Sequence, residues 1–108
     1  MNNKTELKAL FERLPEEDLL MVLQDLRNIG ALEGAAMGIA RLIEARGRAF
    51  MSEKQLWRFL HDAWFDNMTG ECSRCGGSLP PDEMVWAKHF AEGRCGWCQW
   101  QWDKLASA

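Results

Sequence analysis

A mostly α-helical fold is predicted, with a small helical unit over residues 1–68 followed by a cysteine-held module over residues 69–108. Two observations carry this prediction. Apolar residues recur at intervals of three and four along the first part of the chain, which is the spacing of amphipathic helices. The last part holds all four cysteines, and it is too short to bury a hydrophobic core of its own.

The helical unit begins with two predicted helices. Residues 5–14 place apolar side chains at helical spacing, and Pro15 interrupts the pattern. The acidic run Glu16-Glu17-Asp18 suits the positive end of a helix dipole, so a second helix is expected to begin there and to stop near Gly30. The two apolar stripes consist of Leu7, Leu10, Phe11, Leu14, Leu19, Val22, Leu23, Leu26 and Ile29.

A third helix is expected from about Leu32 to Ala45. Gly30, Gly34 and Gly38 repeat every four residues along this region. Small residues at that spacing let a second helix backbone approach closely, so we expect tight packing within the bundle. The alternative is contact with a partner helix, for example in a homodimer.

Ser52 and Gln55 form a predicted capping box, which starts a fourth helix that runs to about Asn67. Its apolar residues cover about half of the helix circumference, so this helix is either well buried or offers a contact surface. These residues are Leu56, Trp57, Phe59, Leu60, Ala63 and Trp64.

Two cysteine pairs predict one zinc site in the module. Cys72 and Cys75 form a C-x-x-C pair, and Cys95 and Cys98 form a second pair after nineteen intervening residues. Two thiolates three positions apart grip one side of an ion, and the second pair supplies the other side. Because four sulfur ligands fill a tetrahedral shell, the single Zn²⁺ is expected to be structural rather than catalytic. The alternatives are His89 in place of one cysteine, two disulfides, or a Cys95–Cys98 dithiol switch.

The glycines after Cys75 permit the positive φ angles of a metal-binding knuckle. The segment 80–83 is expected to turn, residues 84–90 to form a strand of a short β-hairpin, and residues 99–105 to be helical. This order of knuckle, hairpin and helix from Cys72 to Leu105 resembles the treble-clef and zinc-ribbon classes of zinc finger, which implies a structural zinc ion. The two-part layout is also similar in style to small accessory proteins of phages and prophages.

The sequence favours a protein located in the cytoplasm that does not enter the membrane. No run approaches the roughly 18–20 apolar residues that span a bilayer, and the polar N-terminal residues contain no signal-peptide core. Cytoplasmic thiols stay reduced, which favours metal binding over disulfides.

No enzymatic function is expected. The sequence contains no Ser-His-Asp order, P-loop or glycine-rich dinucleotide turn. His61 and Asp62 are expected to be solvated, and His89 lacks the neighbouring Asp that a nuclease finger would require.

Tryptophan is the most unusual component, with six residues against no tyrosine. Because tryptophan is enriched in binding hot spots, we expect a non-enzymatic protein that binds another protein and modulates or inhibits it. An inhibitor or adaptor acting on a host nucleic-acid enzyme or defence complex fits the small size and the acidity. The predicted contact surface consists of Trp57, Trp64, Trp97, Trp100 and Trp102.

Binding to nucleic acid is the alternative function. The balance of 13 Lys and Arg against 16 Asp and Glu gives a net charge of −3, which disfavours a duplex-binding protein. A local basic stretch over residues 41–58 and further cations between the cysteine pairs could still form a groove in which bases stack on indole rings. The residues of this alternative site are Arg41, Arg46, Arg48, Lys54, Arg58, Arg74, Lys88 and Arg94.

Overall fold

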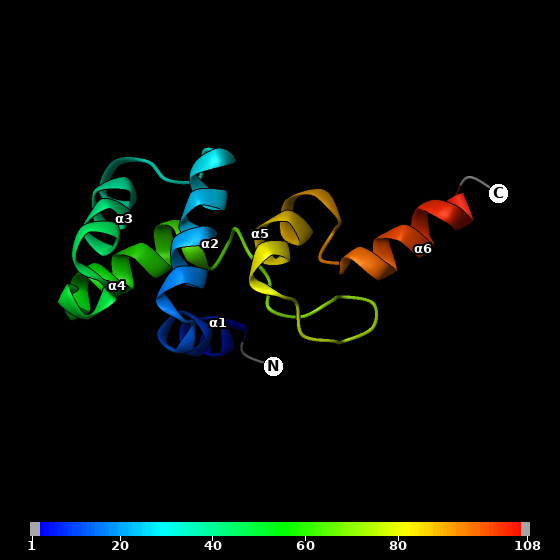
Figure 1. The fold of residues 1–108 in the computed structure, drawn as a ribbon, viewed down its shortest axis with the longest axis horizontal. Coiled ribbons are helices and arrows are strands. Elements are labelled where there is room, and N and C mark those ends of the chain that lie inside the picture. The colour runs from blue at the N-terminus through cyan, green and yellow to red at the C-terminus, as the bar shows by residue number, and fades with distance from the viewer. Residues whose placement is uncertain (1–2, 107–108) are drawn as a thin grey trace.

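A computed structural model describes residues 3–106, and it is predominantly helical (Figure 1). The described residues contain no β-strand, and a single bridge between Glu71 and Ser78 is their only β-type pairing. The elements are α1 (Asn3–Arg13), α2 (Glu16–Asn28), α3 (Gly34–Arg46), the 3₁₀ turn η1 (Arg48–Phe50), α4 (Glu53–Phe59), the π-helical turn η2 (Leu60–Trp64), α5 (Pro81–Phe90) and α6 (Gly96–Ala106).

Helices α1 to α4 with η2 enclose most of the hydrophobic core. The first two helices follow the predicted ranges, and the apolar stripe of α2 is fully buried at Leu19, Val22, Leu23 and Leu26. An ion pair between Arg27 and Glu44 joins α2 to α3 on the surface. Burying apolar stripes against one another supplies most of the stability of helices this short.

The capping box at the start of α4 is confirmed. The backbone N–H of Gln55 donates to Ser52 Oγ at 3.1 Å, and the N–H of Ser52 donates to Gln55 Oε1 at 2.9 Å. The predicted single helix changes to a π-helical turn from Leu60, which ends at Trp64. Phe59, Leu60 and Trp64 are fully buried, so this segment forms the centre of the core.

The glycine repeat does not pack a helix. A Cβ atom placed on Gly30, Gly34 or Gly38 would meet no atom within 4 Å, so the predicted close approach inside the bundle is wrong. Gly30 follows the end of α2 and has a φ angle of +77°, in the left-handed region. Because glycine adopts this region without strain, the end of the helix, and not close packing, accounts for a glycine at this position. The homodimer alternative stays a prediction.

The predicted strand and β-hairpin are wrong, because residues 84–90 belong to helix α5. Pro81 occupies the first turn of α5, where its missing N–H costs nothing, and acidic side chains follow it. The buried residues of α5 are Met84, Val85 and Ala87, which is a helical rather than an alternating pattern.

Helix α5 connects the two parts of the molecule, because it packs on α2 in the most extensive contact between separate helices. Asp25 of α2 and Asp82 of α5 lie close to this contact, and desolvation together with the charge of Asp82 raises the pKa of Asp25. The structure measures 50 × 27 × 21 Å, and helix α6 extends away from the other helices (Figure 1). Only Cys98 is buried in α6, so this helix contributes little to the main core.

Candidate metal centre

The four cysteines converge on one point beside the start of α6. Their Sγ atoms all lie within 4.8 Å of one another, and the Cys75 and Cys95 sulfurs are 4.0 Å apart. A tetrahedral zinc ion with bonds of about 2.3 Å would hold its sulfurs roughly 3.8 Å apart, so this cluster needs only a small contraction to hold the ion. The predicted ligand set therefore fits a metal site, and four sulfur ligands favour zinc.

Backbone N–H groups surround one sulfur in particular. Cys72 Sγ accepts from the N–H groups of Arg74 and Cys75 at 3.4 Å each and from that of Cys95 at 3.2 Å. The N–H of Cys98 donates to Cys95 Sγ at 3.5 Å. These donors stabilise thiolates, which are the form of cysteine that binds metal.

Two buried cysteines of the cluster have opposite pKa shifts. Desolvation acts to raise the pKa of the Cys72 thiol, but the N–H donors around its sulfur outweigh desolvation and lower the pKa to about 6. Desolvation and the neighbouring sulfurs raise the pKa of the Cys98 thiol to about 12. Without an ion the pocket therefore favours one thiolate and keeps Cys98 protonated, so a metal must displace at least this proton.

The loop geometry explains the first of the two glycines after Cys75, whereas Gly77 does not adopt the expected positive φ angle. Gly76 has a φ angle of +74°, and its N–H donates to the Cys72 carbonyl at 3.0 Å, which closes the knuckle. The N–H of Ser73 donates to the Gly93 carbonyl at 2.8 Å, and this bond ties the first knuckle to the segment before the second. The two cysteine pairs are thus brought together by backbone hydrogen bonds as well as by chain connectivity.

Two of the three alternatives for the cysteines receive no support, and the Cys95–Cys98 dithiol switch stays a prediction. All four cysteines are free thiols, so the predicted disulfide alternative is absent from the described residues. His89 lies outside the cluster, where its Nε2 is 3.0 Å from Asn67 Oδ1. Replacement of a cysteine ligand by His89 is therefore wrong.

One residue of the site was missed from the sequence. The Glu83 carboxylate accepts the N–H of Gly96, the first residue of α6, at 2.7 Å. The sequence places Glu83 in an expected turn, thirteen residues away along the chain, and no local pattern links it to the second cysteine pair. Its proximity arises only because α5 is a helix.

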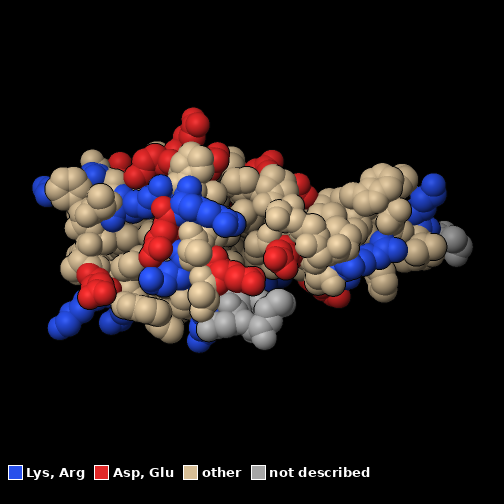
Figure 2. Space-filling model, turned by 90° about the horizontal axis from the view of Figure 1, so that it is seen from below, with Lys and Arg blue, Asp and Glu red and all other residues tan. Residues whose placement is uncertain are grey.

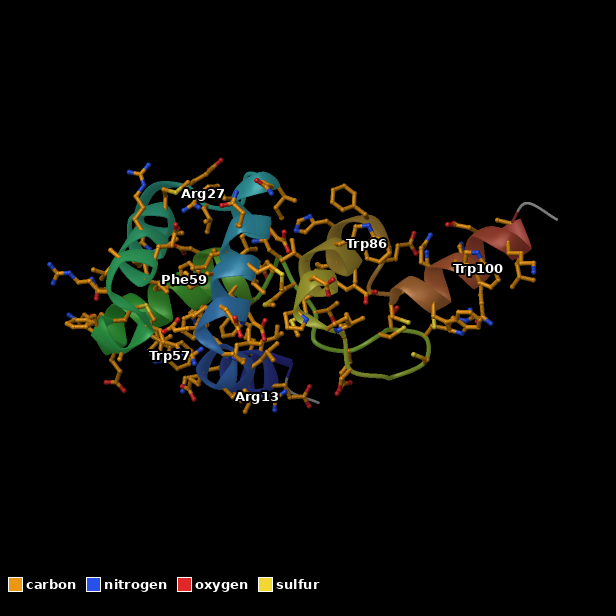
Figure 3. The ribbon with its side chains drawn as sticks, in the orientation of Figure 1. Arg13, Arg27, Trp57, Phe59, Trp86 and Trp100 are labelled. Atoms are coloured by element: carbon orange, nitrogen blue, oxygen red, sulfur yellow. The ribbon has the colours of Figure 1, made fainter. Side chains whose placement is uncertain are left out.

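The tryptophans expected to form one contact surface are separated. Trp64 is fully buried and donates from Nε1 to the Leu7 carbonyl at 2.9 Å, so it belongs to the core and is not available to a partner. Trp57 on α4 is exposed, but it lies at the opposite end of the molecule from Trp100 (Figure 3). The side chain of Trp57 stacks on His61 with ring centroids 5.4 Å apart.

The other three tryptophans of the predicted surface lie on α6, and together with Leu105 we call them the α6 aromatic surface: Trp97, Trp100, Trp102 and Leu105. Their exposed fractions are 63%, 52%, 51% and 67%, which is high for such large apolar side chains. Trp97 and Trp100 stack with centroids 5.2 Å apart. Trp102 follows Trp100 by about 200° around the helix and lies under the Arg94 guanidinium at 4.8 Å.

The basic residues proposed for nucleic acid do not form a single patch. Arg41, Arg46, Arg48, Lys54 and Arg58 belong to the α3–α4 end, whereas Arg74 and Arg94 adjoin α6, and Lys88 lies on α5. On the face that Figure 2 shows, acidic and basic side chains interleave over the helical body, while the charged side chains over the α6 end are mostly basic.

Several of these cations already have partners within the chain. Arg48 donates to the Phe11 carbonyl at 2.9 Å, and Arg58 pairs with Asp62 at 2.5 Å. Near α6, Arg74 donates to Gln101 at 3.0 Å and Arg94 donates to Gln99 at 2.9 Å. These contacts fix the two arginines beside the α6 aromatic surface rather than in a separate groove.

No protein-family model matches the chain, and no similar curated protein or solved structure was found. The knuckle and the C-terminal helix of the zinc-finger resemblance are present, but α5 replaces its hairpin. The resemblance to phage accessory proteins stays a prediction. Among residues 3–106, no helix combines the length and apolar character that crossing a membrane requires.

Proposed function

We propose that this chain is a non-enzymatic, zinc-stabilised protein that binds another protein through the α6 aromatic surface and thereby modulates that partner. The observation that carries the proposal is the exposure of three tryptophans on a helix that contributes only Cys98 to the buried residues. Large indole rings in water are unfavourable unless a partner covers them, and tryptophan is enriched in binding hot spots.

The size of this surface suits the centre of an interface. Trp97 and Trp100 lie on one side of α6 and offer roughly 170–290 Å² of aromatic area, about a fifth to a third of what one partner contributes to a standard interface. Stacking of Trp97 on Trp100 and the cations placed over Trp100 and Trp102 restrict the rings before binding. Such preorganisation lowers the entropy lost on association.

The non-enzymatic part of the proposal rests on the chemistry of the ligands and the surroundings. Four thiolates complete a tetrahedral shell, which leaves no coordination position for a substrate. Asp62 is paired with Arg58, and His61 is held between the rings of Trp57 and Phe65. Whether the protein acts as an inhibitor or as an adaptor stays a prediction.

The test compares variants at the two ends of the molecule. Zinc-loaded protein is immobilised, proteins from an extract of the source organism are captured, and the captured partner is then purified for direct binding measurements. We expect Trp97→Ala with Trp100→Ala to weaken binding at least tenfold, while Trp57→Ala, which deletes an exposed indole ring from α4, leaves binding unchanged. Equal binding by both variants would contradict the assignment of the surface.

The same measurements distinguish the nucleic-acid alternative. The affinity of a contact centred on tryptophan should change little between 50 and 200 mM salt, because its binding free energy comes from apolar burial. Binding that falls steeply over this range and that requires Arg74 and Arg94 would instead show that the surface binds single-stranded nucleic acid.

A further inference from the structure

The attachment of α6 to the rest of the molecule depends on few contacts. Within residues 3–106, Arg74, Arg94 and Glu83 make side-chain hydrogen bonds to α6 from outside this helix. The bond from Gly96 to Glu83 is the shortest of these at 2.7 Å, and it lies between the two ligands Cys95 and Cys98. This position makes Glu83 the contact best placed to control the geometry of the second cysteine pair.

The chemistry of this bond is favourable at a helix start. Gly96 is the first residue of α6, and its N–H has no partner inside the helix. A carboxylate there accepts a charge-assisted hydrogen bond and interacts favourably with the positive end of the helix dipole. Glu83 itself is held in the first turn of α5, next to the buried residues Met84 and Val85. Because α5 packs on α2, the bond from Gly96 to Glu83 connects the helical core to the second cysteine pair.

The Glu83 carboxylate also lies close to the glycine in the second cysteine pair. A Cβ atom on Gly96 would lie 2.9 Å from Glu83 Oε1, which is closer than real Cβ contacts occur. The φ angle of Gly96 does not lie in the left-handed region, so backbone conformation gives no reason for glycine there. A methyl group at position 96 would instead require the carboxylate, at the end of the flexible Glu83 side chain, to shift from its position beside the Gly96 N–H.

We propose that Glu83 is a positioning residue of the metal centre, which acts through Gly96 to hold Cys95 and Cys98 in ligand geometry. It also fixes the direction in which α6 presents Trp97 and Trp100, and this second consequence alone rests on the proposed function. Partners outside the ligand shell of a metal site typically change metal affinity by 10–100-fold when they are removed.

The first test measures zinc affinity of the full-length chain by competition with a chromophoric chelator, together with hydrogen exchange of the Gly96 amide by NMR. Glu83→Ala should weaken zinc binding about 10–100-fold and accelerate exchange of this amide. Glu83→Gln keeps an oxygen acceptor and should retain affinity within a few fold. Asp82→Ala removes the same charge from the same turn of α5 and serves as the matched control.

A double-mutant cycle tests the contact itself. Gly96→Ala should weaken zinc binding in the presence of Glu83, because the new methyl group meets the carboxylate, and should have much less effect when combined with Glu83→Ala. Non-additivity shows that Glu83 and Gly96 are in contact in the folded protein, and together with weaker zinc binding by Glu83→Ala than by Asp82→Ala it supports the proposal. Additive effects, or a Glu83→Ala affinity equal to that of Asp82→Ala, would overturn it. Because no partner is required, this outcome is independent of whether α6 binds another protein.

Discussion

Removal of the metal is expected to release α6 while α1 to α5 stay folded. Most of the hydrophobic core, from Leu7 to Phe65, belongs to α1–α4 and η2, although Cys72 and Cys98 are part of the same cluster, and α5 packs on α2 through its own apolar face. Helix α6, in contrast, buries only Cys98. Chelation of zinc should therefore produce a partly folded molecule rather than a fully unfolded one.

The expected loss of helical circular dichroism on zinc removal follows from the length of α6. An isolated helix shorter than about 12–15 residues is marginal in water, and α6 has 11 residues with no apolar face against the body. The loss of helical circular dichroism should thus correspond to about these 11 residues, with the remaining helical signal unchanged. Structural zinc sites in finger peptides bind with about 10–16 kcal/mol at pH 7, which is ample to order such a segment.

The assay combines circular dichroism with hydrogen exchange detected by mass spectrometry, before and after addition of a chelator, with zinc content from elemental analysis. We expect one zinc per chain and loss of protection at residues 71–79 and 94–106, while residues 19–26 of α2 stay protected. Retained protection of α6 in the metal-free protein would refute the reasoning. Simultaneous loss of protection in α2 would equally refute it, because the body would then depend on the metal.

Three further predictions concern single sites and pH. Trp64→Phe removes the bond from the indole to the Leu7 carbonyl and leaves a cavity in the core, so it should lower the free energy of unfolding by about 1–3 kcal/mol in urea denaturation, whereas Trp57→Phe should change it by less than about 0.5 kcal/mol. Ser52→Ala removes the cap of α4 and should cost about 0.5–2 kcal/mol, seen as a lower Tm, with an unchanged Tm as the contrary result. Zinc affinity should fall as pH falls, because the metal must displace the proton that the raised pKa keeps on Cys98. The decrease should steepen below about pH 6, where Cys72 also becomes protonated, and a flat profile from pH 5.5 to 8 would contradict this.

Local sequence signals predicted those parts of the fold that depend on neighbouring residues. The stripe of α2 and the capping box at Ser52 each involve residues no more than four positions apart, and both are present as expected. The cysteine spacing predicted the cluster, because a C-x-x-C pair defines its own knuckle geometry. These features require no knowledge of the tertiary structure.

Features that depend on tertiary packing were not predictable in this way. The apolar run in residues 84–90 is short enough to suit a strand or a helix, and packing on α2 decides for the helix. Trp57 and Trp64 lie on the same helical segment, yet only Trp64 meets the α1 backbone and becomes buried. The contact of Glu83 with Gly96 needs α5 to be helical, so it could not follow from an expected turn.

Because α6 projects from the molecule, binding and folding depend on different residues, whereas in most small domains the same residues must serve both. Outward side chains such as Trp97 and Trp100 can be exchanged without altering the helical core, provided that the sulfur ligands and Gly96 are retained. The molecule is therefore suited to acquire new recognition properties by substitution along one exposed helix, while its folding is maintained elsewhere. It offers a small scaffold on which specificity and stability can evolve, or be engineered, as independent variables.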